Sequence, residues 1–217
     1  MGDEQIDHNE PTRSENEPTR IAVFVSGGGT NLQALIDASA RGEIPDGRID
    51  LVISSNAQAY ACERASRAGI PARVVVPWDY PDRSAWESAL RVELEDAHIQ
   101  MIILAGWMQI LSANFVSHYQ NRIINIHPSL IPSFCGPGYY GLHVHEAALA
   151  RGVKVTGATV HFVTDIADGG PIIAQKAVDV ADSDTPQSLQ RRVMEQAEWI
   201  LLPQAAQRVA AQIRREM

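Results

Sequence analysis

Short apolar runs alternate with helical patterns up to residue 126, and this alternation limits the possible folds more than any other feature of the chain. Each run is continuous, as is typical of strands buried on both faces of a parallel sheet. We expect strands over residues 21–26, 49–54, 72–76, 99–104 and 122–126. We expect helices over residues 58–69, 83–97 and 112–118, and another that begins at Asn31. The short connections predict an α/β fold with an open, mostly parallel sheet and helices on both faces.

The pattern changes after residue 127. Prolines and glycines between residues 128 and 141 predict a long loop, and a helix is expected over 143–151. Two strands, 155–163 and 171–180, are expected to run antiparallel at the sheet edge. The last helix is expected to have Asp184 as its cap, Pro186 in the first turn and Gln187 at the capping-box position. Its core side would carry Leu189, Val193, Ala197 and Ile200, and Pro203 would kink or end it.

The composition excludes several classes of protein. With a net charge of −8, the chain lacks the basic patch of a nucleic-acid binder. No apolar run approaches the ~20 residues of a membrane span, and the N-terminus lacks the apolar core of a signal peptide. The two cysteines, Cys62 and Cys135, favour the reducing cytosol over a disulfide framework. Residues 1–19 predict a disordered polar tail, which leaves 20–217 as a single domain, expected to be a monomer or a homodimer with small-molecule substrates.

A glycine-rich turn, Ser26-Gly-Gly-Gly-Thr-Asn31, joins the first expected strand to the first helix. Glycines let the backbone approach a ligand, and free amides at a helix start bind phosphate without a lysine. A dinucleotide would favour glycine where Leu32 stands, and a nucleoside triphosphate would favour Gly-Lys-Ser/Thr, which the chain lacks here. The turn therefore predicts a site for a phosphate monoester, with a plain tight turn as the competing interpretation. The expected donors are Gly29, Thr30 and Asn31.

Asn125 and His127 lie two residues apart at the end of the fifth expected strand and therefore point the same way, toward the usual ligand edge. When an amine attacks a carbonyl carbon, an amide donor stabilises the growing oxyanion and an imidazole moves the proton. Asp168, in a turn before two glycines, would favour the charged imidazolium if it reached His127. The competing interpretations are a polar pair that satisfies local backbone groups and an ordinary turn aspartate. His161 is expected to be a core histidine or to support the site.

A metal site is the alternative use of the histidines. Cys135, His143 and His145 lie close together in sequence, within or just after the expected loop. Their spacing matches no familiar zinc pattern, and no second cysteine is near. We therefore expect no metal.

Four motifs resemble those of the phosphoribosylglycinamide formyltransferase family, over a stretch from about residue 21 to about residue 203. They are residues 26–37, 104–111, 125–132 and 156–163, the last followed by Asp-Gly-Gly-Pro at 168–171. One alone is moderately specific, whereas four in the right order are highly specific. The resemblance implies a Rossmann-like formyltransferase fold and a one-carbon transferase of purine biosynthesis. Such an enzyme takes the formyl group of 10-formyltetrahydrofolate, its co-substrate, to the amine of phosphoribosylglycinamide.

The resemblance also implies roles for individual residues. The phosphate of the ribonucleotide would be bound by Gly29, Thr30 and Asn31. The folate would be bound by Arg83, Met108, Gln109, Ile110, Leu111 and Asn125, largely through the backbone of 108–111. The catalytic trio would be Asn125, His127 and Asp168, with Asp168 favouring the charged form of His127.

The chain departs from the family pattern at several positions. Gln109 stands where arginine is frequent, and Trp107 stands where phenylalanine is frequent. Glu198-Trp199 replaces a frequent Glu-His pair, and the spacing near it differs by one residue, so we assign no substrate contact to Glu198. The segment 134–140 is longer than in the shortest members of the family.

Three other functions remain open at this point. A 10-formyltetrahydrofolate hydrolase would use a similar trio with water as acceptor, but we expect it to carry an N-terminal regulatory domain, where this chain has a tail of about 20 residues. A methionyl-tRNA formyltransferase would need basic charge and a C-terminal RNA-binding domain. A phosphate- or nucleotide-binding module would leave Asn125, His127 and Asp168 without a purpose.

Overall fold

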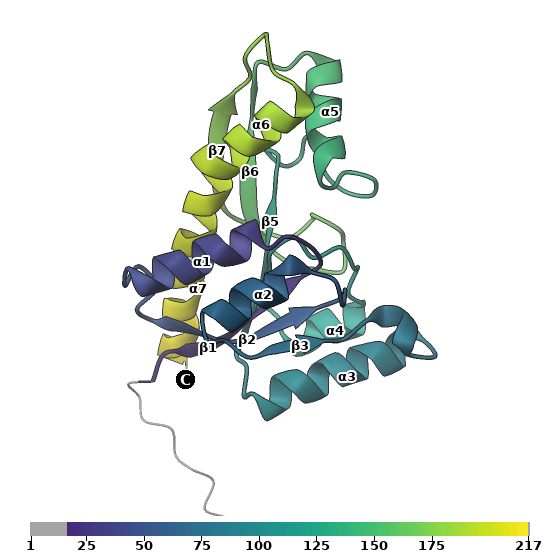
Figure 1. The fold of residues 1–217 in the computed structure, drawn as a ribbon, viewed down its shortest axis with the longest axis vertical. Coiled ribbons are helices and arrows are strands. Elements are labelled where there is room, and N and C mark those ends of the chain that lie inside the picture. The colour runs from purple at the N-terminus through teal and green to yellow at the C-terminus, as the bar shows by residue number, and fades with distance from the viewer. Residues whose placement is uncertain (1–16, 217) are drawn as a thin grey trace, which may run out of the picture.

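The computed structural model, which describes residues 17–216, contains a seven-stranded sheet in the order β3-β2-β1-β4-β5-β6-β7 (Figure 1). The strands are β1 (Thr19–Val25), β2 (Gly47–Ser54), β3 (Ala72–Val74), β4 (Met101–Leu104), β5 (Ile123–His127), β6 (Val155–Phe162) and β7 (Ile172–Asp179). β1 to β5 pair in parallel, whereas β6 and β7 pair antiparallel with their neighbours. The predicted open, mostly parallel sheet with antiparallel edge strands is therefore confirmed.

Helices cover both faces of this sheet. They are α1 (Thr30–Ala40), α2 (Tyr60–Arg67), α3 (Arg83–Asp96), α4 (Ala113–His118), α5 (Leu142–Arg151), α6 (Pro186–Val193) and α7 (Trp199–Glu216), with a 3-10 turn η1 (Pro77–Asp79) and a π-helical turn η2 (Met194–Glu198). Successive side chains of β1 enter two separate cores: Ile21 and Val23 pack with α1 and α7, whereas Ala22 and Phe24 pack with α3 and α4. The apolar runs are continuous because both faces of each central strand are buried.

The fold begins inside the expected polar tail. Thr19 is the first residue of β1 and is fully buried. Its hydroxyl donates to the carbonyl of Ala210 in α7 at 2.8 Å, which ties the first strand to the last helix. The first strand therefore begins one residue before the expected boundary. Residues 1–16 of the expected tail lie outside the described residues, so their disorder stays a prediction.

The C-terminal helices differ from expectation at three points. Thr185 caps α6 in a reciprocal capping box with Ser188, which leaves Asp184 free to pair with Arg192. The extra residue in η2 rotates the chain that follows, so Leu201 and Leu202 are buried while Ile200 is 37% exposed. Pro203 does not end the helix, because it lies near the start of α7, where η2 has already interrupted the regular hydrogen-bond ladder.

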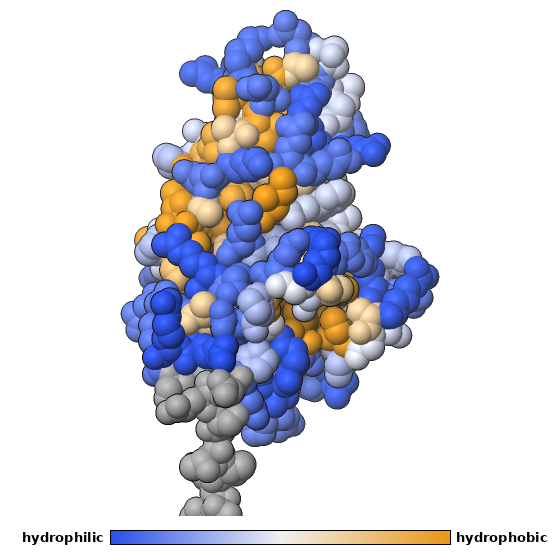
Figure 2. Space-filling model, turned by 90° about the vertical axis from the view of Figure 1, so that its left-hand side faces the viewer, coloured by the Kyte–Doolittle hydropathy of each residue, from blue (hydrophilic) through white to orange (hydrophobic). Residues whose placement is uncertain are grey.

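The far edge of the sheet is formed by β7. Val155 and Ile172, at the ends of the two antiparallel strands, are each 47% exposed. Figure 2, which views the molecule from the left-hand side of Figure 1, shows apolar residues gathered over the upper half of this face among hydrophilic ones.

None of the helices between residues 17 and 216 is both long and apolar enough to cross a membrane.

Candidate active site

A cavity of about 720 Å³ opens at the carboxyl ends of the parallel strands, the edge at which open α/β sheets bind ligands. Its walls come from the stretch after β4, the end of β5, the loop 136–141, the turn 163–168 and η2. Of the predicted site residues, the walls include Asn31, Met108, Gln109, Ile110, Leu111, Asn125, His127 and Asp168. Gly29, Thr30 and Arg83 do not line the cavity.

His161 of β6 fixes the side chain of Asn125. The two residues lie opposite each other in the antiparallel register of β5 and β6. Nδ1 of His161 donates to the carbonyl of Phe162 at 2.8 Å, and Nε2 lies 3.1 Å from the side-chain nitrogen of Asn125 and 3.6 Å from Oδ1 of Asp168. His161 is 2% exposed and contacts Asn125, so it is both a core histidine and a support of the site. A second N–H of the Asn125 amide is left to face the cavity.

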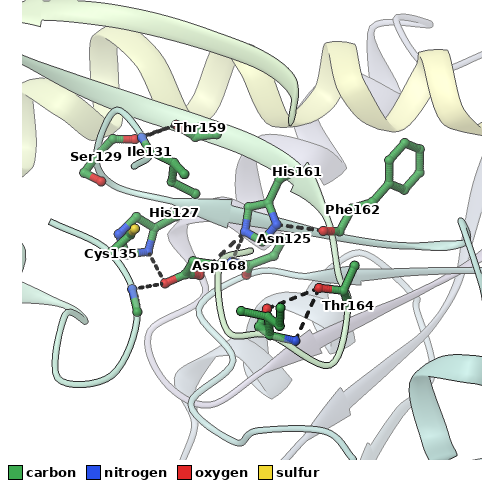
Figure 3. A network of polar contacts seen from close by, with 12 residues as sticks. Asn125, His127, Ser129, Ile131, Cys135, Thr159, His161, Phe162, Thr164 and Asp168 are labelled. Atoms are coloured by element: carbon green, nitrogen blue, oxygen red, sulfur yellow. Dashed lines mark hydrogen bonds and ion pairs between the residues drawn. The ribbon is translucent and has the colours of Figure 1, made fainter. Parts of the chain in front are cut away.

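Asp168 reaches His127 from the turn between β6 and β7, in a left-handed conformation with φ of +54°. Its Oδ2 atom lies 3.5 Å from Nδ1 of His127 and accepts the amide of Gly136 at 2.8 Å (Figure 3). Burial raises the pKa of Asp168, but His161, His127 and the Gly136 amide outweigh burial and hold the pKa below its ordinary value. Asp168 is therefore a carboxylate at neutral pH, and its negative charge lies beside the His127 ring.

The glycine turn is held from behind by α2. Gly29 has a φ of +71°, and a Cβ atom there would lie 2.6 Å from Cβ of Ala61. Nε of Arg64 donates to the carbonyl of Gly28 at 2.8 Å, and the amide of Ala61 donates to Gly27 at 3.1 Å. These bonds occupy carbonyl groups of the turn and leave the amides at the start of α1 available for an anion.

Glu198, to which no substrate contact was assigned from the sequence, lies in the cavity. It is 6% exposed, lines the cavity at the end of η2, and accepts the side-chain amide of Asn31 at 2.7 Å. Burial raises its pKa to about 7, with the Asn31 bond opposing the rise. Glu198 is the last residue of the π-helical turn, a feature frequent at functional sites. In the folded helix, the carboxyl group of Glu198 faces Asn31 at the end of the glycine turn. The sequence pattern alone did not predict this contact.

The stretch after β4 is anchored at both ends. The amide of Ser26 donates to the carbonyl of Gly106 at 3.1 Å, and the hydroxyl of Ser26 accepts the amide of Met108 at 2.9 Å. At the other end, Glu87 of α3 accepts both the amide and the hydroxyl of Ser112. The wall formed by 108–111 is therefore fixed relative to the glycine turn. Arg83 begins α3 outside this wall, so its ligand contact stays a prediction.

The three residues weighed as zinc ligands have separate environments. Burial, and after it the charge of His127, lowers the pKa of His145 to about 4, and neither ring nitrogen finds a hydrogen-bond partner within residues 17–216. His143 pairs with Glu146 on the surface, and burial raises the pKa of the Cys135 thiol. In the described part of the chain, no three His, Cys, Asp or Glu side chains group closely enough to hold a metal ion.

Comparison with known proteins points to one family. A model described as formyl transferase matches residues 19–205. The human trifunctional purine biosynthetic protein adenosine-3 is 46% identical over 197 residues, which are 91% of this chain but only 19% of that protein. The phosphoribosylglycinamide formyltransferase of Escherichia coli K12 is 43% identical over 176 residues, which are 81% of this chain and 80% of that protein.

Comparison with solved structures points to the same family. Glycinamide ribonucleotide transformylase 1 from Symbiobacterium toebii has a TM-score of 0.84 and 42% identity, covering 96% of this chain and 94% of that one. Phosphoribosylglycinamide formyltransferase from Brucella melitensis has a TM-score of 0.82 and 42% identity, covering 90% of this chain and 97% of that one. The resemblance thus extends from the sequence motifs to the whole fold.

Proposed function

The chain belongs to the formyl transferase family, and from this membership we propose that it transfers the formyl group of 10-formyltetrahydrofolate to the amine of phosphoribosylglycinamide. The products are formylglycinamide ribonucleotide and tetrahydrofolate, and the reaction is a step of purine biosynthesis. The observation that carries the proposal is the arrangement of Asn125, His127 and Asp168 on one wall of the cavity.

These residues suit the electronic demands of the transfer. As the amine attacks the formyl carbon, a new C–N bond forms and the formyl oxygen becomes negative. The Asn125 amide donates to that oxygen, and the positive charge of the His127 imidazolium stabilises it. When the bond to N10 of the folate breaks, the proton lost by the amine ends on N10, and His127 is the group that relays it. Asp168 balances the charge of His127 through this cycle.

Two further regions supply binding contacts: the start of α1, which meets the cavity at Asn31, and the wall formed by 108–111. We assign the phosphate to the amides of Gly29, Thr30 and Asn31, at the positive end of α1. Glu198, bonded to Asn31, is the acceptor for hydroxyl groups of the adjoining ribose. The folate binds along 108–111, where Met108 and Ile110 are 49% and 60% exposed. The cavity volume is within the range of small-molecule sites.

An acceptor-dependence assay tests the proposal. The purified protein is incubated with 10-formyltetrahydrofolate, with and without phosphoribosylglycinamide, and tetrahydrofolate is followed over time. We expect turnover only when the acceptor is present. Equal turnover without acceptor would identify a hydrolase, and no turnover under either condition would identify a binding module. Either result would overturn the proposed transfer.

A further inference from the structure

We propose that residues 134–136 of the long loop position the catalytic pair: the carbonyl of Phe134 decides which nitrogen of His127 carries the proton, and the amide of Gly136 holds Asp168. The chemical importance of this clamp rests on the proposed function of His127 and Asp168. The contacts themselves belong to the protein without substrate and are testable there.

The first contact fixes the imidazole. Nε2 of His127 lies 2.8 Å from the carbonyl oxygen of Phe134. Because a carbonyl only accepts hydrogen bonds, Nε2 must be the protonated nitrogen of the neutral ring. Phe134 has a φ of +51°, an uncommon conformation for a bulky residue. Its ring meets that of Tyr139 edge-on, with centroids 6.2 Å apart.

The base of the loop is held rigidly up to this point. The buried hydroxyl of Thr159 on β6 accepts the amide of Ile131 at 3.1 Å and donates to the carbonyl of Ser129 at 2.7 Å. The hydroxyl of Ser129 in turn donates to the carbonyl of Ser133 at 2.6 Å. The residue before Phe134 is thereby tied to the sheet, so the Phe134 carbonyl is presented to His127 from a fixed support.

The second contact fixes the carboxylate. The amide of Gly136 donates to Oδ2 of Asp168 at 2.8 Å, and the same oxygen faces Nδ1 of His127 at 3.5 Å (Figure 3). Asp168 and Phe134 both adopt left-handed conformations, and they meet the imidazole at different nitrogens. Strained residues of this kind persist where the surrounding structure over-determines them, frequently at functional sites.

The clamp has a definite chemical consequence. With the proton of the neutral ring on Nε2, the lone pair of Nδ1 faces the Asp168 carboxylate, which is unfavourable. A second proton on Nδ1 removes this repulsion, because the Nε2–H group then faces the Phe134 carbonyl and the Nδ1–H group faces the Asp168 carboxylate. The clamp therefore orients both N–H groups of a protonated ring, one toward Phe134 and one toward Asp168, so that such a ring acts on the oxyanion through its positive charge. Without the Phe134 carbonyl, Asp168 alone would draw the single proton of a neutral ring to Nδ1, as in the serine-protease triad.

Nitrogen NMR of the full-length protein tests the tautomer directly. Two-bond ¹H–¹⁵N correlations, recorded without substrate at a pH where His127 is neutral, show which ring nitrogen is protonated. The His127 signals are assigned by their loss in His127→Gln. We expect the Nε2–H tautomer. An Nδ1–H tautomer in the wild-type protein would overturn the proposal, whatever the result of the formyl-transfer assay.

Two substitutions of Phe134 separate the backbone from the side chain. Both remove the aromatic ring, but asparagine tolerates the left-handed conformation, whereas β-branched valine strongly resists it. We expect Phe134→Asn to keep the Nε2–H tautomer and Phe134→Val to lose it. The kcat of the Asn variant should exceed that of the Val variant at least tenfold, with smaller differences in both KM values. Equal tautomers and equal kcat values in two folded variants would contradict the clamp.

Discussion

At the scale of single residues, the site is built on backbone conformations that most side chains avoid. Gly29 adopts such a conformation without penalty, whereas Asp168 and Phe134 adopt it at a cost of ~1–2 kcal/mol each. The residue types around the cavity were evident from the sequence, because the glycines and Asn125-x-His127 stand at strand ends. The strain at Phe134 was not, because nothing in its side chain favours a positive φ.

Gly29→Ala is expected to raise the KM for phosphoribosylglycinamide about tenfold, equivalent to ~1.4 kcal/mol, and to change the KM for the folate much less. The reason is steric: the new Cβ would lie 2.6 Å from Cβ of Ala61 and push the turn away from α2. Gly42→Ala is the matched control, because Gly42 has a φ of +73° with no described atom within 4 Å of the added Cβ. Steady-state kinetics and Tm of both variants provide the measurement. If both substitutions act alike, or both KM values rise equally, the turn is not the phosphate site.

Glu198 should make stability depend on pH. Because burial raises its folded pKa to about 7, above the ordinary 4.5, its contribution is fully present below pH 4.5 and is lost as pH rises through 7. Glu198→Gln removes this titration and keeps an acceptor for Asn31. Between pH 5 and 8, the free energy of unfolding should fall by ~2–3 kcal/mol more in the wild type than in the variant. Parallel pH profiles in denaturant titrations would show that Glu198 does not titrate in this way.

At the scale of elements, the continuous apolar runs predicted the strands of the sheet, and the strand ends differ from expectation by a few residues. The order of the strands in the sheet was not predicted. The last helix was harder to predict, since a periodic pattern assumes one regular helix. The π-helical turn η2 breaks that assumption, which is why Ile200 is partly exposed although it fits the α-helical spacing. The turn also brings Glu198 to Asn31. The element that the periodic pattern failed to predict therefore also helps to shape the site.

Deletion of the exposed residue Gln196 from η2 should be tolerated. The turn then becomes regular α-helix and the flanking segments keep their faces, so Tm should change by only a few degrees and kcat by only a few-fold. Deletion of the exposed residue Arg208 is the matched control. It lies in the regular part of α7 and would rotate Ile213 and the end of the helix out of the core, at a cost of several kcal/mol. Equal destabilisation by the two deletions would show that η2 does not absorb an extra residue.

At the scale of the whole molecule, the site joins segments that are distant in sequence. His127 ends β5, Asp168 follows β6, and Glu198 belongs to the C-terminal helices. The sequence indicated that Asn125 and His127 share a face, because the two-residue period of a strand is fixed. The residues alone left open whether Asp168 reaches His127, which only the family resemblance implied, and they gave no sign that loop carbonyl and amide groups hold the pair. Backbone contacts of this kind depend on the conformation of the loop and do not require a particular residue type, so the sequence does not reveal them.

The most direct test of the proposed mechanism is a double-mutant cycle on kcat for formyl transfer. Asp168→Asn keeps the shape of the side chain and removes its charge, while His127→Ala removes the imidazole. Each single substitution should lower kcat by ~10²-fold or more, less than the ~10⁴-fold loss in the serine-protease triad, where a wrong tautomer adds to the effect. The double variant should be hardly worse than either single variant, because the pair acts as a unit. Near-normal kcat in Asp168→Asn, or losses that simply multiply in the double variant, would contradict the coupling of Asp168 to His127.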